Sequence, residues 1–443
     1  MTNANEKGPS FVRGLTLLGA VALIVGNMVG TSIYTLPASL AKEVGPLGLV
    51  AWVVTAAGYL FVALVYARLG TSMPRTGGPY VFARAAFGDF TAFQVVWSYW
   101  FSAVIGNAAI AFGVVGYVAG FSRELEQSPV AQFGVAQLIL WGLCAVNVLG
   151  VKHSSRLQIV ILFANVVPLV VIALLALPSF DAANLQPFAP HGWSALPLGV
   201  SLIVWAYSGI ESATVPAEEV EAAESTIRRS TMIGYVIGTA VFLLAALAVA
   251  GVLPNDVAAS SARPIALAAE RTVGPFGGYV IAIVAIAAGL GTLNGWILMA
   301  GRIPVSAASD GLFFRSFGRI HPRFHTPALS LVLGTLIASA MLTLVLQKSL
   351  LDAFGWIVQL ALLTTLVPHL VVAAADFVIA RRASPPLERS KMRRVTITAC
   401  LAFLFVAFAI WGLGAETWMW GSLVFVVGVP LYFVLKRGSR AQN

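Results

Sequence analysis

GLTLLGAVALIVGNMVGTSIYTLPASLAKEVG, residues 14–45, decides the fold of this chain. The stretch is long and apolar enough to cross a bilayer, for which about 20 residues suffice, yet its middle holds Gly26, Asn27, Gly30, Thr31 and Ser32. Because Gly costs about 1 kcal/mol inside a helix, this cluster predicts a break at membrane depth. Broken backbone must line a cavity or be buried, and the following half-helix begins with partial positive charge. We expect a carboxylate-binding site; close helix packing through small residues is the alternative.

A second stretch, VSLIVWAYSGIESATVPAEEV at residues 200–220, has the same character, with Ser208, Gly209, Glu211 and Ser212 at its middle. Interruptions at corresponding places in two halves of a membrane protein point to an inverted repeat with the substrate between them. A carboxylate at the depth of Glu211 is costly unless it is paired, hydrated or protonated, so it is a functional candidate. The alternative for Glu211 is a protonated, hydrogen-bonded structural acid.

The composition extends this interpretation to the whole chain. Of 443 residues 59% are hydrophobic and 10% charged, with a mean hydropathy of +0.88, whereas a soluble domain carries about 25% charged residues. We expect an all-helical polytopic membrane protein with twelve spans, no cleaved signal peptide, and Cys144 and Cys400 inside spans without a disulfide or metal. The expected spans are 14–41, 47–70, 90–122, 129–150, 156–178, 195–218, 230–253, 275–302, 327–346, 352–380, 395–413 and 418–435.

The basic residues predict the orientation. The chain has 27 Lys and Arg residues. If both termini are in the cytoplasm, those that fall outside the cell are Lys42, Arg123, Arg263, Arg271 and Lys348. Cytoplasmic loops of membrane proteins are enriched in Lys and Arg, so this topology is favoured. The net charge of +9 thus lies in short loops such as 302–326 and 381–394, and predicts a lipid bilayer as partner and no nucleic acid. The polar segment 74–88 is expected to form a short helix along the inner face.

Other classes of protein find little support in the sequence. It contains no Gly-rich phosphate loop, metal-ligand cluster or Ser/His/Asp arrangement, so we expect neither an enzyme nor a cofactor. A membrane sensor would carry a signalling domain, whereas the expected tails, 1–13 and 436–443, are short. A channel would conduct without saturable exchange.

Within the spans, His369 could titrate near neutral pH and take part in gating or proton movement, or it could simply hydrogen-bond between helices. Four aromatic residues lie away from the span ends: Tyr99, Trp205, Tyr207 and Trp296. Their faces could attract a guanidinium or ammonium group. Core packing is the alternative for each.

Several motifs resemble one known family. GNMVGTSIYTLPASLA is similar to the G-N-x-x-G-S-G-[IV]-x-x-L-P segment of the amino acid/polyamine/organocation permeases. GGPYVFARAAFG, YWFSAVIGNAAIA, WAYSGIESA, GTLNGWILMAG and AASDGLF resemble further segments of it, and the resemblance runs from about residue 14 to 435. Within the family the chain most resembles the bacterial arginine/agmatine, lysine/cadaverine and ornithine/putrescine antiporters.

The resemblance implies a fold and a division of the chain. The fold is a five-plus-five inverted repeat of the LeuT type, with helices 1 and 6 broken and two additional C-terminal helices. Its repeats would be 14–178 and 195–380, followed by the last two spans at 395–435. The resemblance also implies alternating access in the inner membrane and, as in many members, a homodimer.

The resemblance also implies a set of site residues. The substrate-binding residues would be Asn27, Thr31, Ser32, Ile33, Tyr99, Ala103, Asn107, Trp205, Ser208, Glu211, Trp296 and Ala361. The first break would hold the carboxylate of the substrate on its backbone, and carbonyls near Trp205 and Ser208 would hold its amino group. The residues of gating and proton movement would be Tyr80 on the inner side, Glu211 and His369.

The chain departs from the family at several of these positions. Thr31 and Ser32 stand where the family has Ser and Gly. His369 stands where the family has a Tyr. In the side-chain pocket, residues that are more polar or sulphur-bearing in the arginine/agmatine antiporter are replaced by Ala103, Ile110 and Ala361. The function expected is exchange of a cationic amino acid for its decarboxylated amine. A proton-linked or facilitative permease for neutral amino acids, or an amine importer, is the alternative.

Overall fold

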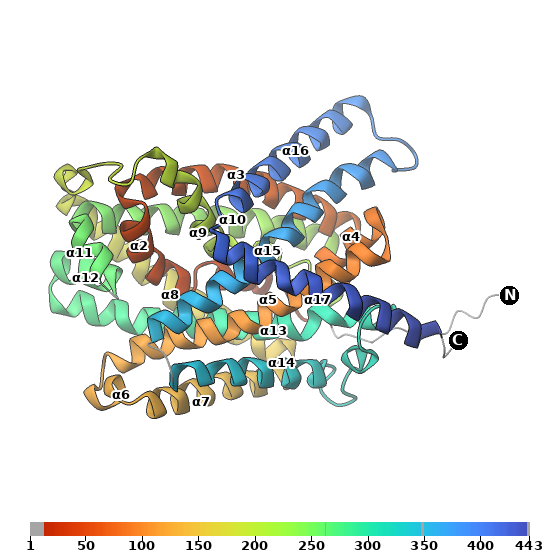
Figure 1. Ribbon diagram of the computed structural model, residues 1–443, viewed down its shortest axis with the longest axis horizontal. Coiled ribbons are helices and arrows are strands. Elements are labelled where there is room, and N and C mark those ends of the chain that lie inside the picture. The colour runs from red at the N-terminus through yellow and green to blue at the C-terminus, as the bar shows by residue number, and fades with distance from the viewer. Residues whose placement is uncertain (1–12, 262, 347–349, 441–443) are drawn as a thin grey trace.

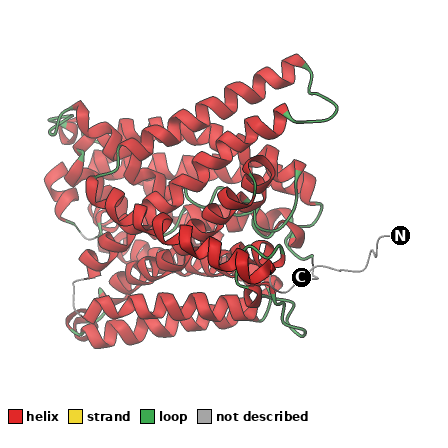
Figure 2. Cartoon of the chain, turned by 45° about the vertical axis from the view of Figure 1, so that its right-hand side comes forward, coloured by secondary structure: helices red, strands yellow, loops and turns green. Residues whose placement is uncertain are grey.

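The computed structural model of the protein describes residues 13–261, 263–346 and 350–440. In these ranges all regular structure is helical apart from one isolated bridge between Leu15 and Val220, and Figure 2 shows the helices joined by loops near their ends. Most of the expected tail 1–13, the end of the tail 436–443, and Lys348 lie outside the described residues.

The helices follow the expected spans closely. They are α1 (Leu17–Met28), α2 (Thr31–Glu43), α3 (Gly48–Ser72), α4 (Pro79–Phe87), α5 (Asp89–Ala119), α6 (Arg123–Gln127), α7 (Pro129–Val148), α8 (Val151–Ala176), α9 (Leu196–Tyr207), α10 (Ala223–Val252), α11 (Asn255–Ser260), α12 (Pro264–Val273), α13 (Pro275–Ser309), α14 (Ala328–Met341), α15 (Leu350–Arg381), α16 (Arg389–Trp411) and α17 (Ala415–Arg440). In the described part of the chain, ten helical stretches are long and apolar enough to cross a membrane. The other two expected spans fall on shorter apolar helices, Trp193–Tyr207 and Ala328–Met341.

Three expected boundaries differ from the structure. The first span is divided between α1 and α2, and the sixth stops being an α-helix at Tyr207, although we expected it to reach residue 218. The eighth continues to Ser309. Consequently Arg302, which we expected at the edge of an inner loop, lies within α13 and is fully buried. That expectation was wrong because the apolar pattern ends before the helix does.

Burial separates central from peripheral helices. The most apolar part of the α1–α2 stretch is 89% buried and that of α5 is 78% buried, compared with 28% for α7 and 22% for α17. Figure 1 shows α7 and α14 along one edge of the molecule and α16 along the opposite edge. Peripheral helices expose large apolar side chains, including Leu138, Val426 and Val434. This pattern is typical of helices that face lipid, because exposed apolar surface is stable there.

The loops gather at the two ends of the bundle. Figure 1 shows α4, the turn between α15 and α16, and the last turns of α17 at one end. Helices α6, α11 and α12 lie at the other end. The short helix expected within 74–88 is present as α4. The loops expected inside the cell and those expected outside therefore lie at opposite ends.

Candidate functional site: a cavity where two broken helices meet

The first break lies between α1 and α2, at Val29 and Gly30. Breaking a helix frees carbonyl groups that need hydrogen-bond donors when they are buried. Neighbouring helices supply them: Asn165 of α8 donates to the Val29 carbonyl at 2.6 Å, and Thr292 of α13 donates to the Gly26 carbonyl at 2.6 Å. A Cβ on Gly30 would collide with the Thr292 side chain, so only Gly permits this close approach of α13.

Helix α2 begins at the cavity, with Thr31 and Ser32 in its first turn. The first N–H groups of a helix have no intrahelical acceptor, and they give that end partial positive charge. The Ser32 hydroxyl donates to the Met28 carbonyl at 3.2 Å, so this side chain also stabilises the end of α1. The start of α2 can therefore receive an anionic group from the cavity.

The second break begins where α9 ends, at Ser208. From there to Pro216 the chain forms consecutive turns, and we had expected helix on both sides of the break. Gly209 has φ +114°, and a Cβ there would lie 2.7 Å from the Cβ of Asn27. Asn27 also donates from Nδ2 to the Ser212 hydroxyl at 2.8 Å. The two breaks are therefore in direct contact.

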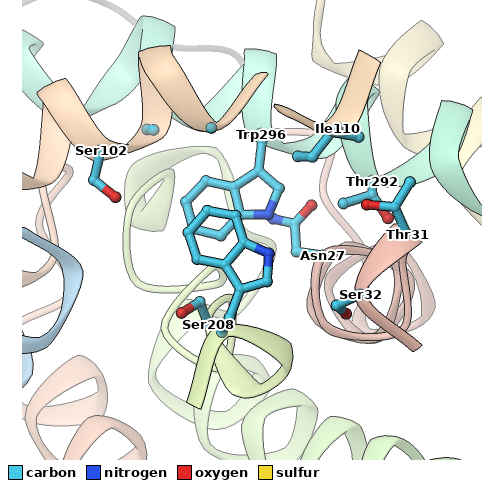
Figure 3. Close-up of a pocket in the computed structure, with 11 residues that line it drawn as sticks. Asn27, Thr31, Ser32, Ser102, Ile110, Ser208, Thr292 and Trp296 are labelled. Carbon is cyan, nitrogen blue, oxygen red and sulfur yellow. The ribbon is translucent and has the colours of Figure 1, made fainter. Parts of the chain in front are cut away.

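A cavity lies at this contact, where about 370 Å³ is free of protein atoms, including space that is open to solvent. Its lining comes from α1, α2, α5, α9 and α13, and most of it is drawn and labelled in Figure 3. The lining residues are Asn27, Thr31, Ser32, Ser102, Ala103, Gly106, Ile110, Trp205, Ser208, Thr292 and Trp296. None of these is acidic. In the described part of the chain, Oδ1 of Asn27 has no hydrogen-bond partner although the atom is buried, so an acceptor remains available to a ligand.

The predicted site residues divide into two groups. Those that line the cavity are Asn27, Thr31, Ser32, Ala103, Trp205, Ser208 and Trp296. Those that do not are Ile33, Tyr99, Asn107, Glu211 and Ala361. The sequence interpretation missed Ser102, Gly106 and Thr292. Each lies one helical turn, three or four residues, from a predicted or discussed residue, so a search at i±3 and i±4 would have found them.

Glu211 lies behind the cavity and is fully buried. Its Oε1 accepts a hydrogen bond of 2.5 Å from the Tyr99 hydroxyl, and its Oε2 accepts one of 3.1 Å from the N–H of Gly209. The Tyr99 ring contacts Trp296 edge-on, with centroids 6.4 Å apart. Trp296 in turn lines the cavity, so a single aromatic contact joins Tyr99, and through it the carboxylate, to the cavity wall.

His369 of α15 lies on the other side of Glu211. Its Nε2 is 4.0 Å from Oε2 of Glu211, and both side chains are fully buried. Its Nδ1 lies 2.8 Å from the Tyr66 hydroxyl of α3. The structure thus brings together two of the residues to which the sequence assigned gating and proton movement.

Tyr80, the third of these residues, lies elsewhere, at the α4 end of the bundle. Its hydroxyl donates to Oδ2 of Asp310 at 2.9 Å, and Asp310 also pairs with Arg75 at 2.9 Å and with Arg84 at 2.5 Å. Burial alone would raise the pKa of Asp310, but the hydrogen bonds from Arg75 and Tyr80 and the two positive charges lower it below its usual value. Burial and the nearby Asp310 carboxylate raise the pKa of Tyr80. This cluster holds α4 against the end of α13.

A second ion pair fixes the chain beyond the second break. Arg302 of α13 and Glu219 form a fully buried salt bridge. The Glu219 carbonyl accepts hydrogen bonds of 3.0 Å from the N–H groups of Gly14 and Leu15, just before α1. Glu219 therefore joins two parts of the chain, the part just before the first break and the part just after the second, to each other and to α13.

Fold and site together define a class: a multi-pass membrane protein with a small cavity, lined by hydroxyl, amide and aromatic side chains, at the contact of two interrupted helices. Comparisons with known proteins identify the family, because the profile of the amino acid permease family matches residues 15–433. The chain belongs to that family.

Three curated relatives are similar along most of their length. The chain is 29% identical over 448 residues to a putative arginine/ornithine antiporter of Bacillus subtilis (strain 168), covering 93% of each protein. It is 27% identical to the putrescine transporter PotE of Escherichia coli (strain K12), covering 95% of this chain and 96% of the relative. It is 30% identical to the cadaverine/lysine antiporter of the same organism, covering 81% of this chain and 82% of the relative.

Proposed function

We propose that the protein exchanges a cationic amino acid for its decarboxylated amine across the inner membrane. The observation that carries this proposal is the pair of unlike helix ends at one cavity. The start of α2 offers N–H groups to a carboxylate, and the end of α9 offers carbonyl groups to an ammonium group. An amino acid would thus have a partner for each end, and the relatives that match most of the chain are named for arginine, ornithine, lysine, putrescine and cadaverine.

The predicted residues take specific roles in this proposal. Thr31, Ser32 and Ile33 present the backbone that binds the carboxylate. Trp205 and Trp296 enclose the substrate, and their faces attract the positive side chain. Asn107 and Glu211 act on that side chain indirectly, since neither lines the cavity. Tyr80 closes the α4 end through its bond to Asp310.

The same arrangement supports transport by alternating access. The expected inverted repeats, 14–178 and 195–380, each begin with a broken segment, and these two segments meet at the cavity. In the proposed cycle, the broken segments move relative to α5 and α13 and open the cavity first to one side and then to the other. Both termini and α4 face the cytoplasm in this proposal, and a homodimer is its expected assembly.

Counterflow in liposomes tests the exchange. Vesicles with purified protein are loaded with putrescine, agmatine, cadaverine or buffer, and uptake of labelled ornithine, arginine or lysine is measured. We expect the matching amine to accelerate initial uptake at least tenfold. Uptake that does not depend on internal substrate would overturn the proposal. A Trp296→Ala variant should lower exchange strongly, while Trp411→Ala on the exposed face of α16 should not.

One observation favours a second candidate, a permease for neutral amino acids. None of the residues that line the cavity is Asp or Glu, and a bound cation usually has a carboxylate partner. The same assay decides between the candidates, because labelled alanine, serine and leucine would be taken up by vesicles loaded with buffer.

A further inference from the structure

A surface at the α4 end of the bundle carries positive charge that no carboxylate offsets. We call it the basic surface, and it comprises Arg156 near the start of α8 and, in the loop between α13 and α14, Arg319, His321, Arg323 and His325. All of these except the half-buried His321 are exposed. In the part of the chain that the structure describes, none of the three arginines forms an ion pair with Asp or Glu. The flanking residues 149–176 and 311–330 include no acidic residue.

Other arginines at this end of the bundle have partners within the protein. Arg75 and Arg84 share Asp310, and Arg302 is bonded to Glu219. The general preference for basic residues on the cytoplasmic side explains why arginines gather here, but not why some of them are paired and others are not. The charge of the basic surface, unlike that of the paired arginines, is available to an anion outside the protein.

Two contacts hold the loop against the turn that leads into α8. The Thr326 hydroxyl donates to the carbonyl of Val148, the last residue of α7, at 2.9 Å. A Cβ on Gly150 would lie 3.6 Å from the carbonyl oxygen of Phe324. The Arg323 guanidinium lies 5.5 Å from the centroid of the Phe324 ring, at the distance of a cation–π contact. Arg323 is therefore held in the part of the loop that adjoins the start of α8.

Beyond Arg156, helix α8 carries an exposed apolar stripe. The stripe residues are 47–66% exposed and recur every three or four positions, so they share one face of the helix: Val160, Phe163, Val167, Val171 and Leu174. Arg156 precedes Val160 by four positions and shares that face. At 1.5 Å per residue, Arg156 and Leu174 are about 27 Å apart along the axis, close to the roughly 30 Å of a bilayer's hydrocarbon core. Arg156 therefore lies at the level where lipid headgroups begin.

We propose that the basic surface binds the phosphate of an anionic phospholipid whose acyl chains lie along the stripe of α8. The planar guanidinium groups of Arg156 and Arg323 match phosphate oxygens in charge and in geometry. An anionic phospholipid carries a net negative charge, whereas the phosphate of phosphatidylcholine is offset by its own ammonium group. The stripe gives the lipid a second contact that a free phosphate ion lacks. The orientation proposed above places this lipid in the cytoplasmic leaflet.

Quenching of a fluorophore beside the stripe tests this binding without any substrate. Cys144 is buried, so Cys400→Ser removes the exposed thiol and Val160→Cys supplies a single accessible one next to Arg156. The labelled protein is placed in phosphatidylcholine nanodiscs that contain a small fraction of lipid with brominated acyl chains, either phosphatidylglycerol or phosphatidylcholine. We expect brominated phosphatidylglycerol to quench at least about threefold more strongly, since each basic residue near a membrane surface favours anionic lipid by a factor of about five.

Salt and free phosphate identify the source of the bound phosphate group. Raising the NaCl concentration to about 1 M shortens the Debye length to about 3 Å, so the two brominated lipids should then quench more nearly alike. Inorganic phosphate, added at constant ionic strength, should leave the preference unchanged. A preference that inorganic phosphate removes would show a site for the soluble ion and overturn the lipid.

Variants locate the site. Arg156→Gln together with Arg323→Gln removes two charges of the basic surface, and we expect the two brominated lipids to quench this protein equally. The matched control is Arg228→Gln with Arg229→Gln, which changes an exposed adjacent pair in the second turn of α10. Four glutamates within residues 218–224 precede this pair, so its surroundings hold no excess of positive charge. The control should keep the full preference for phosphatidylglycerol.

The outcomes are distinct. Equal quenching by the two lipids in the labelled protein overturns the proposal. So does a preference that survives Arg156→Gln with Arg323→Gln, which would place the lipid elsewhere, or one lost in the control as well, which would reflect overall charge. Should the first double variant fail to fold, Arg156→Gln alone, at an exposed position of α8, decides by the same measurement. Counterflow is measured separately, so a failure of the proposed exchange would leave the lipid site standing.

Discussion

The two breaks differ in length and in what holds them. The first spans two residues, Val29 and Gly30, and its free carbonyl groups are bound by side chains of α8 and α13. The second runs from Ser208 to Pro216 and is held largely by its own hydrogen bonds, such as those from Ser212 N–H to the Gly209 carbonyl and from Thr214 N–H to the Glu211 carbonyl.

Their electrostatic characters differ as well. The first break opens onto the positive start of α2, whereas the second follows the negative end of α9 and carries the carboxylate of Glu211. A short break whose carbonyl groups are bonded by neighbouring helices suits a preformed binding site for an anion. A long break that is bonded largely to itself has fewer ties to neighbouring helices than the first one has. Four substitutions test this distinction.

The largest effect is expected where the second break is tied to α13. Glu219→Gln leaves the fully buried guanidinium of Arg302 without a counter-charge. Removing one partner of a buried ion pair costs about 3–5 kcal/mol, so the midpoint of thermal unfolding should drop and transport should be lost. Glu218→Gln, an exposed neighbour, is the matched control. A Glu219→Gln protein as stable as the control would show that Arg302 does not anchor the segment.

A smaller effect is expected where the two breaks touch. Gly209→Ala places a Cβ 2.7 Å from the Cβ of Asn27 at a residue with φ +114°, and we expect a loss of about 2–3 kcal/mol and a fall in uptake. Gly274→Ala distinguishes the effect of the steric collision from the effect of the positive φ. Gly274 also has positive φ, at +79°, but a Cβ on this residue would meet no atom within 4 Å. Equal losses in both variants, measured by thermal unfolding, would mean that backbone strain alone is responsible.

The sequence predicted the positions of both breaks but not their form. Gly and polar residues in an apolar span reveal an interruption, because they weaken a helix wherever it packs. They do not reveal whether helix resumes afterwards: Thr31 starts a new helix, whereas Ser208 starts a run of turns. That outcome depends on contacts with distant residues such as Asn165 and Thr292, which supply hydrogen bonds to the first break.

The residues of the site were likewise predicted only in part from the sequence. Seven of twelve predicted substrate-binding residues line the cavity, since motif resemblance identifies which segments come together. Thr292 was missed because a threonine in a helix of small residues stands out only by its place one turn before Trp296. Arg302 was misplaced because a basic residue at the end of an apolar run looks like a loop residue, and its partner Glu219 lies 83 positions away.

Thr292→Val tests whether the first break is the carboxylate site. Valine has the shape of threonine but cannot donate to the Gly26 carbonyl, which loses a bond of 2.6 Å. Leaving a buried carbonyl without that donor costs about 1–3 kcal/mol. We expect the apparent affinity for the amino acid, measured by thermal shift with added ligand, to fall about tenfold while that for the amine changes little. An equal loss for both ligands would place the carboxylate elsewhere.

The smallest effect is expected at the α4 end of the bundle. There the Gly77 N–H, just before α4, donates a hydrogen bond to the Val215 carbonyl of the second break, and Asp310 bonds to Tyr80 of α4. The pKa of Asp310 is lowered in the folded protein, so its contribution to stability is complete above the ordinary aspartate value of about 3.9 and is lost as the pH falls through the lower, folded value. Its arginine partners are partly exposed, so we expect Asp310→Asn to cost under about 1 kcal/mol.

This cost should stay constant between about pH 5 and pH 8 and disappear only on stronger acidification, as judged by unfolding midpoints of the unchanged and Asp310→Asn proteins. Asp89→Asn, which removes the other carboxylate bonded to Arg84, is the control and should change the midpoint less. A difference that grows as the pH falls would mean that Asp310 binds its proton more tightly in the folded protein.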